Sequence, residues 1–85
     1  MGGKVVVINK TDRIIHCFVS KYSASSGDDA WFDVNPSAAE HWTRTWWELV
    51  AFKDSSDSTR SAVYVKIDHN RTIEFYSFDD IRVVV

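Results

Sequence analysis

The residues best suited to chemistry lie in one tryptophan-rich segment, "EHWTRTWWELVAF", at positions 40–52. Three of the chain's four tryptophans, Trp42, Trp46 and Trp47, fall within six positions of one another. If the segment is one extended strand, bent near Thr45, its side chains alternate between two faces. One face then carries Trp42, Arg44, Trp46 and Glu48.

This face has the composition of a sugar-binding surface. The C–H groups of a pyranose rest on flat aromatic rings, and its hydroxyl groups need planar donors and acceptors at the edge of the ring. The preceding stretch "WFDVN" adds polar groups that we expect at the rim. The predicted carbohydrate-binding residues are therefore Trp42, Arg44, Trp46, Glu48, Asp33 and Asn35.

The same pattern allows a second interpretation, in which most of the tryptophans pack in the core or between strands. Val50 and Phe52 continue the Trp-Arg-Trp-Glu face and are apolar, which favours burial of that face. Glu48 would then pair with Arg44 or Arg60. The opposite face of the segment, formed by Trp47, Leu49 and Ala51, has the composition of a core in either case.

No arrangement of residues indicates catalysis. Cys17 stands next to His16, but neighbours on a strand point to opposite faces, so the thiol and the imidazole cannot meet. The three histidines, at positions 16, 41 and 69, lack the spacing of metal ligands. We expect a protein that is not an enzyme, with no catalytic residues, no metal and no cofactor.

Aspartate-rich turns leave calcium open as an alternative, because this ion takes six or more oxygen ligands from such loops. If the strands run up and down, alternate turns share an end of the molecule. One end would carry Asp12, Asp54, Asp57, Asp79 and Asp80, and the other Asp28, Asp29 and Asp68. No turn matches a calcium-loop signature, and Asp and Ser are ordinary turn residues.

The elements that must position these residues are short strands. Clusters of Asn, Asp and Ser separate runs rich in Val, Ile and aromatic residues, a pattern typical of an all-β protein. The expected strands cover 4–8, 13–22, 30–34, 40–53, 60–67, 71–76 and 81–85, with one helical turn after Pro36. The 85 residues are expected to form one domain, 1–85, a small antiparallel β-sandwich of seven or eight strands.

The net charge and the composition limit the kinds of partner and the cellular compartment that we expect. The formal net charge of −2 disfavours nucleic acid, because there is no basic surplus to displace counterions from phosphates. No apolar leader is evident at the start of the sequence and there is one cysteine, so we expect a cytoplasmic protein.

A resemblance follows from the order of motifs along the chain: "VVVINKT", the loop "SSGDD", the strand "WFDV" running into "NPS", and then the tryptophan-rich segment. This order resembles small fungal β-sandwich proteins, the fruiting-body lectins and the lipid-binding aegerolysins. The resemblance implies a cytosolic recognition protein whose ligand is a glycan or, as the alternative, a membrane lipid head group. It assigns no ligand residue.

Valine-rich strands at both ends of the sequence, "KVVVI" and "RVVV", indicate self-association. An open strand edge without proline, bulge or several charges is prone to pair with another chain. Either the two strands pair with each other within one chain, or each pairs across a two-fold axis. We expect a homodimer, and a self-associating structural or storage protein is the third candidate function.

Overall fold

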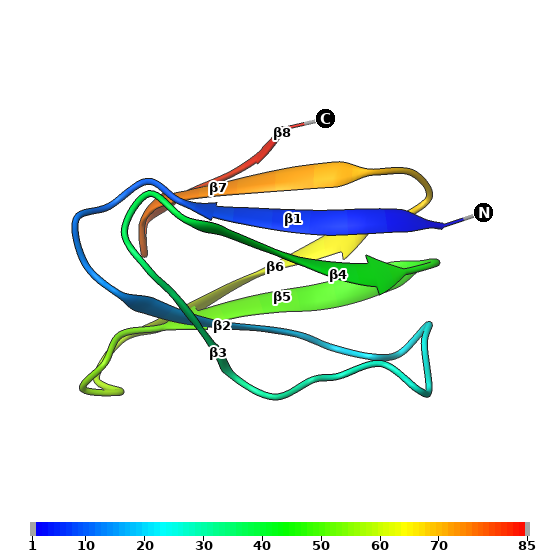
Figure 1. Cartoon of the computed structure of the whole chain (residues 1–85), viewed down its shortest axis with the longest axis horizontal. Helices are drawn as coiled ribbons and strands as arrows, with labels where there is room; N and C mark the ends of the chain where they lie inside the picture. The colour runs from blue at the N-terminus through cyan, green and yellow to red at the C-terminus, as the bar shows by residue number, and fades with distance from the viewer. Residues whose placement is uncertain (1, 85) are drawn as a thin grey trace.

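The computed structural model describes residues 2–84 as eight strands in two four-stranded sheets that pack face to face (Figure 1). The strands are β1 (Gly3–Asn9), β2 (Ile15–Val19), β3 (Phe32–Val34), β4 (Ala39–Arg44), β5 (Trp47–Lys53), β6 (Arg60–Lys66), β7 (Arg71–Ser77) and β8 (Asp80–Val84). The predicted all-β sandwich is confirmed.

The strand order is β4-β1-β7-β8 in one sheet and β3-β2-β5-β6 in the other. Neighbouring strands are antiparallel except β1 and β7, which run parallel. The hypothesis that the first and last strands pair with each other is wrong. The first strand is central, between β4 and β7, whereas β8 pairs only with β7 and lies at an edge of its sheet.

Alternation along the strands fills the core as expected. In β2 the side chains of Ile15, Cys17 and Val19 are buried, and in β7 those of Ile73 and Phe75 are. Burial raises the pKa of the Cys17 thiol, so this residue is a packing group and not a nucleophile. The remaining core residues are Val5, Val7, Val34, Trp42, Val50, Phe52, Val65 and Ile67.

The segment predicted as one bent strand over 40–53 is two strands in different sheets. The chain reverses at Thr45 and Trp46, so β4 joins β1 while β5 joins β2 and β6. The predicted helical turn after Pro36 is wrong. Ser37 has a positive φ of 63° in a tight turn, and Ala39 already pairs with Ile8.

In β5 the face that reaches the core is the one that continues the predicted Trp-Arg-Trp-Glu face, as the second interpretation of the segment has it. Glu48 points into the core with Val50 and Phe52, and is completely buried. The face formed by Trp47, Leu49 and Ala51, predicted as core, lies on the outside of its sheet instead. A polar residue is inside and apolar residues are outside, which contradicts the simple hydrophobic assignment of this strand.

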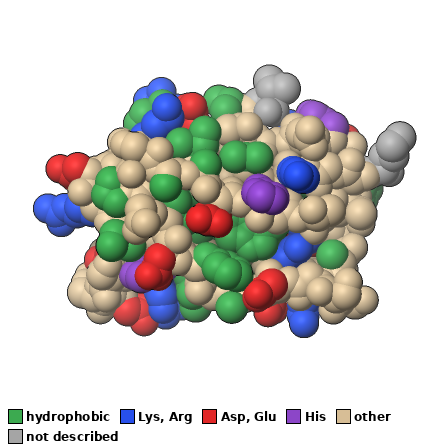
Figure 2. Space-filling view, viewed as in Figure 1, with side chains coloured by type: hydrophobic (Ala, Val, Ile, Leu, Met, Phe, Trp, Pro, Cys, Tyr) green, Lys and Arg blue, Asp and Glu red, His purple; other side chains and the backbone are tan. Residues whose placement is uncertain are grey.

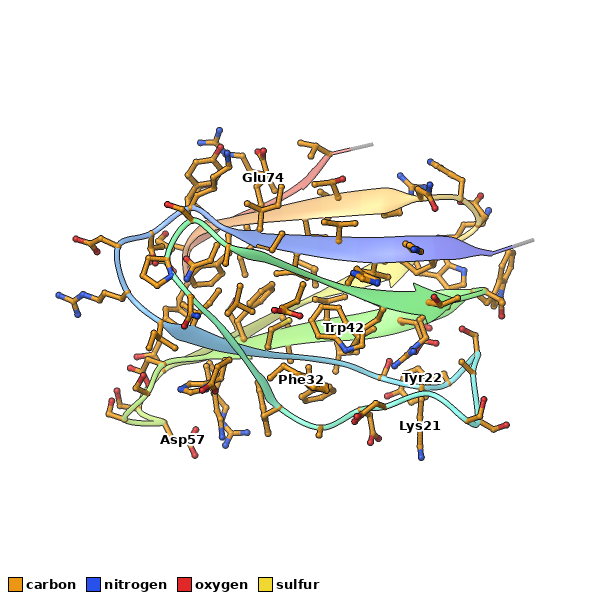
Figure 3. The ribbon with its side chains drawn as sticks, viewed as in Figure 1. Lys21, Tyr22, Phe32, Trp42, Asp57 and Glu74 are labelled. Carbon is orange, nitrogen blue, oxygen red and sulfur yellow. The ribbon has the colours of Figure 1, made fainter. Side chains whose placement is uncertain are left out.

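The side of the sandwich between β3 and β4 is closed by two aromatic rings. Trp42 of β4 and Phe32 of β3 meet edge to face, with ring centroids 5.9 Å apart, and Figure 3 shows both side chains on this side of the molecule. Hydrophobic side chains remain visible near the middle of this side of the molecule in Figure 2. The bulk of Trp42 therefore seals an open side of the core.

Candidate functional site

The predicted Trp-Arg-Trp-Glu face does not exist as a surface. Trp42 is 7% exposed, Arg44 2% and Glu48 0%, whereas Trp46 is 53% exposed in the turn between β4 and β5. Trp42 and Arg44 point inward from one sheet and Glu48 points inward from the other. Because only Trp46 reaches solvent, these four residues cannot together bind a sugar, and the second interpretation of the segment describes its structure.

The two predicted rim residues, Asp33 and Asn35, have different roles in the structure. Asp33 is exposed on β3, where its carboxylate lies 2.7 Å from Nδ1 of His16. Asn35 is exposed in the turn after β3, and its backbone carbonyl accepts a hydrogen bond from Ala38 N–H. Asn35 thus stabilises the turn, while Asp33 lies on the outer surface of the β3-β2-β5-β6 sheet.

The buried Glu48 carboxylate holds the loop that follows β2. It accepts hydrogen bonds from the hydroxyl groups of Ser20 and Ser23. It also accepts hydrogen bonds from the backbone N–H groups of Tyr22 and Ser23, at 3.0 and 2.8 Å. Charge-assisted bonds of this kind compensate the cost of burying a carboxylate.

Arg44 holds the same loop from the opposite sheet. Its guanidinium donates to the carbonyl groups of Ser20 and Asp28, both at 2.7 Å, and its Nε lies 3.8 Å from the Glu48 carboxylate. The predicted pairing of Glu48 with Arg44 is confirmed. A Cβ on Gly27 would lie 2.7 Å from Nη1 of Arg44, so glycine is needed there for the close approach.

The surface best suited to a ligand is the outer side of the β3-β2-β5-β6 sheet, which we call the outer face. It is formed by His16, Phe18, Trp31, Asp33, Trp47, Leu49, Ala51, Lys53, Arg60, Ala62, Tyr64 and Lys66. These residues alternate with the core residues of the same strands. Aromatic and cationic side chains therefore share one side of a rigid sheet.

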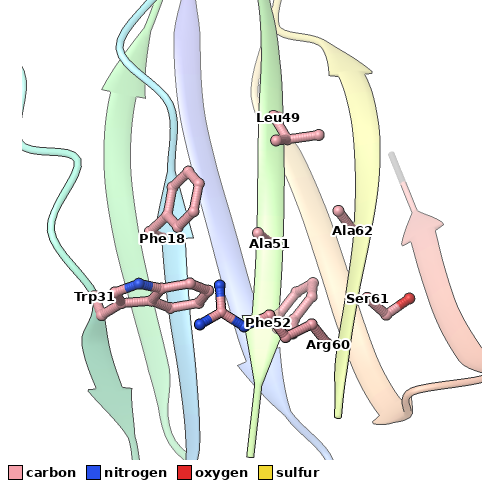
Figure 4. A pocket seen from close by; sticks show the side chains of 8 residues that line it. All are labelled: Phe18, Trp31, Leu49, Ala51, Phe52, Arg60, Ser61 and Ala62. Atoms are coloured by element: carbon pink, nitrogen blue, oxygen red, sulfur yellow. The ribbon is translucent and has the colours of Figure 1, made fainter. Parts of the chain in front are cut away.

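A shallow groove of about 330 Å³ crosses the outer face (Figure 4). Its floor is low because Ala51 and Ala62 are register partners across β5 and β6. Phe18 and Trp31 rise beside this floor, with ring centroids 4.7 Å apart and planes at 84°. Two small residues between large aromatic neighbours thus create a concave apolar surface.

Cations lie at the mouth of the groove. Lys53 Nζ is 4.5 Å and Arg60 Cζ is 5.5 Å from the centroid of the Trp31 ring. Arg60 also donates two hydrogen bonds to the Asp57 carboxylate, at 2.8 and 2.9 Å, and these bonds lower the pKa of Asp57. Arg60 is the only ionisable residue among those that line the groove, so the groove itself has no general acid or base.

A second aromatic cluster lies on the same sheet, towards the turn between β4 and β5. The rings of Trp47 and Tyr64 stack with centroids 5.0 Å apart, and Lys66 Nζ lies 5.1 Å from the Trp46 ring. Trp46, Trp47 and Tyr64 are all exposed. We call these four residues, Trp46, Trp47, Tyr64 and Lys66, the aromatic end.

Sequence reasoning missed Phe18, Trp31 and Arg60, although one signal pointed to the first of them. The buried stripe of Ile15, Cys17 and Val19 implies that Phe18 faces outward, where a phenylalanine is unusual. The alanines of the floor gave no signal, because their facing positions depend on the register between β5 and β6.

Two other features, a metal cluster and a membrane-spanning helix, were sought among the described residues. Among residues 2–84, no three His, Cys, Asp or Glu side chains are grouped so that they could hold a metal ion. Over the same span there is no helix of the length and hydropathy needed to cross a membrane. Comparison with protein-family models, curated proteins and solved structures found no match to this chain.

We predict that Glu48→Gln destabilises the protein strongly. The substitution keeps the volume of the side chain but leaves the Arg44 guanidinium without its buried counter-charge, and such losses cost about 3–5 kcal/mol. Chemical denaturation measures the free energy of unfolding. The matched control is Glu40→Gln, at an exposed position of β4, which should change stability by less than about 0.5 kcal/mol. Equal effects of the two substitutions would contradict a structural role for Glu48.

Proposed function

We propose that the protein is a carbohydrate-binding module whose ligand occupies the groove on the outer face. The observation that carries this proposal is the alanine floor beside the Phe18 and Trp31 rings, with Arg60 at its mouth. The volume of about 330 Å³ suits a small ligand such as one sugar ring, since ligand sites begin at about 300 Å³.

The chemistry of the groove matches that of a sugar. The aromatic walls and the alanine floor offer apolar contact to the C–H groups of a pyranose ring. Arg60, Lys53 and Asp57 offer charged donors and acceptors to hydroxyl groups at its edge. The sheet below is paired on both sides along β2 and β5, so the site needs little ordering when the ligand binds.

A lipid head group is the second candidate, and the aromatic end favours it. Exposed Trp and Tyr rings beside a lysine are the side chains that settle at a membrane–water interface. The net charge of −2 opposes it, because there is no polybasic attraction to anionic lipids. The groove therefore supports the glycan more strongly.

We also propose that two copies of the chain associate along β8. This strand is an edge strand with Val83 and Val84 exposed, and its one cation, Arg82, is already paired with Asp80 at 2.9 Å. Antiparallel pairing across a two-fold axis would satisfy the free backbone groups of this edge. It would also duplicate the groove, which raises avidity for a glycan-covered surface.

The glycan proposal predicts that the protein binds at least one ligand on a glycan array and that Trp31→Ala weakens this binding tenfold or more. Tenfold corresponds to about 1.4 kcal/mol, the size expected for the loss of one aromatic wall. Ala62→Phe, which fills the floor of the groove without removing a wall, should weaken binding in the same way. Circular dichroism would check that both variants fold.

Trp46→Ala is the matched control, because it removes an exposed tryptophan of the aromatic end and leaves the groove intact. Its affinity for the glycan should equal that of the unmodified chain. Binding to no glycan, or loss of binding only in Trp46→Ala, would contradict the assignment to the groove. Co-sedimentation with vesicles that contain no glycolipid, abolished by Trp46→Ala, would support the lipid candidate instead.

The dimer proposal predicts that Val84→Lys converts a dimer into a monomer, because like charges would meet across the two-fold axis. Light scattering measures the molar mass of each species. Thr43→Lys, on the edge strand β4 at the other side of the same sheet, is the control and should remain dimeric. A folded Val84→Lys variant with unchanged mass would show that β8 is not the interface.

A further inference from the structure

His16, predicted to be isolated, has polar partners at both ring nitrogens. Its Nδ1 lies 2.7 Å from Oδ1 of Asp33, and its Nε2 lies 3.3 Å from Oγ of Ser55. An ionised aspartate only accepts hydrogen bonds, so Nδ1 carries the proton and Nε2 is left to accept from a hydroxyl group. The imidazole thus links a carboxylate and a serine hydroxyl through its two ring nitrogens.

Three separate elements bring these groups together. Asp33 and His16 are register partners on β3 and β2. Ser55 comes from the turn between β5 and β6, which lies beside the start of β2 at one end of the sheet (Figure 1). His16 is also the register partner of Lys53, the last residue of β5, which places the turn next to the imidazole.

The surroundings of Ser55 supply the other parts of an acyl-transfer site. The backbone N–H groups of Ser55 and Ser56 have no hydrogen-bond partner within residues 2–84, whereas the Asp57 N–H in the same turn donates to the Asp54 carbonyl. An open cavity of about 490 Å³ adjoins the turn, lined by Ser55, Ser56, Asp54, Arg13 and Ile14. Ile14 gives this cavity an apolar wall and Arg13 a cation, and the two free N–H groups belong to serines that line it.

We propose that Ser55, His16 and Asp33 form a hydrolytic triad that acts on carboxylic esters with a short acyl chain. Ser55 and His16 are the catalytic residues, and Asp33 is the positioning residue that holds the tautomer of His16. The inference does not depend on glycan binding, because the cavity beside Ser55 and the groove share no lining residue.

The reaction proceeds in two balanced steps. Ser55 Oγ attacks the ester carbonyl carbon while His16 Nε2 takes the hydroxyl proton, and the carbonyl electron pair moves to oxygen. The intermediate collapses, the C–O bond to the alcohol breaks, and the alcohol leaves with the proton from Nε2. Water then attacks the acyl-serine, giving its proton to Nε2, and the bond to Oγ breaks. The carboxylic acid leaves, and Ser55 recovers its proton from His16.

The site itself suggests the size and polarity of the ester. Ile14 provides an apolar wall for a short acyl chain, and the backbone N–H groups of Ser55 and Ser56 can receive the oxyanion. The cavity is open to solvent through exposed residues at the end of the sheet, so the alcohol portion can be large. The class of substrate is therefore a small acyl group carried on an accessible alcohol.

The test is labelling of the intact chain with an alkyl fluorophosphonate, followed by peptide mapping, together with the hydrolysis of p-nitrophenyl acetate. We expect one adduct, on Ser55, and an initial burst of p-nitrophenol that Ser55→Ala removes. His16→Asn should slow labelling by about 100-fold or more, the usual contribution of a general base. Asp33→Asn should slow it as well, and Asp33→Glu should restore part of the rate.

Ser26→Ala is the matched control, because it removes an exposed serine hydroxyl from the loop between β2 and β3 and leaves every residue of the proposed site unchanged. It should be labelled at the rate of the unmodified chain. Three results would overturn the proposal: no adduct on Ser55, adducts spread equally over the serines of the turn, or hydrolysis that Ser55→Ala leaves unchanged. All positions are on the surface or half-buried, and thermal unfolding would verify that each variant is folded.

Discussion

The buried pair of Arg44 and Glu48 is the interaction on which the rest of the structure depends. The two side chains come from strands in different sheets, and together they bind the loop that connects β2 to β3. Burying two charges costs several kcal/mol for each ion unless other bonds compensate. Here such bonds are present, because every buried side-chain nitrogen and oxygen in residues 2–84 has a hydrogen-bond partner.

The Arg44–Glu48 pair fixes the position of the loop between β2 and β3. A loop of about a dozen residues with serines, a glycine and two aspartates has little reason of its own to adopt one shape. Arg44 fixes the Asp28 carbonyl, and the Asp28 carboxylate accepts the Ala30 N–H at 2.9 Å. The next residue is Trp31, a wall of the groove, and β3 follows with Asp33. The loop that this pair holds therefore leads directly into Trp31 of the groove and into Asp33 of the proposed triad.

The sequence predicted the fold correctly because β-structure depends on local alternation and turn residues. The buried stripe of β2 and the apolar face of β7 could be assigned from spacing alone. The candidate site could not be predicted, because both strands formed by the 40–53 segment turn the proposed sugar-binding face towards the core. Alternation places Trp42, Arg44, Glu48, Val50 and Phe52 on one face, and all five are buried, but alternation alone does not say which face meets solvent.

Glu48 is a residue that is almost never fully buried, and its burial depends on partners from a loop more than 20 residues away in sequence. The groove and the Asp33–His16–Ser55 line also join residues from separate strands, and only the register between strands brings them together. Such contacts leave no pattern in a single sequence.

The most direct measurement of the central claim is native-state hydrogen exchange of the Tyr22 and Ser23 amides in the unmodified protein. Amides in an exposed loop normally exchange through local opening of low free energy. If Glu48 holds this loop, both amides should exchange only through openings that disrupt the core, with protection close to that of β5. Exchange as fast as that of the unpartnered Ser55 and Ser56 amides would contradict the account.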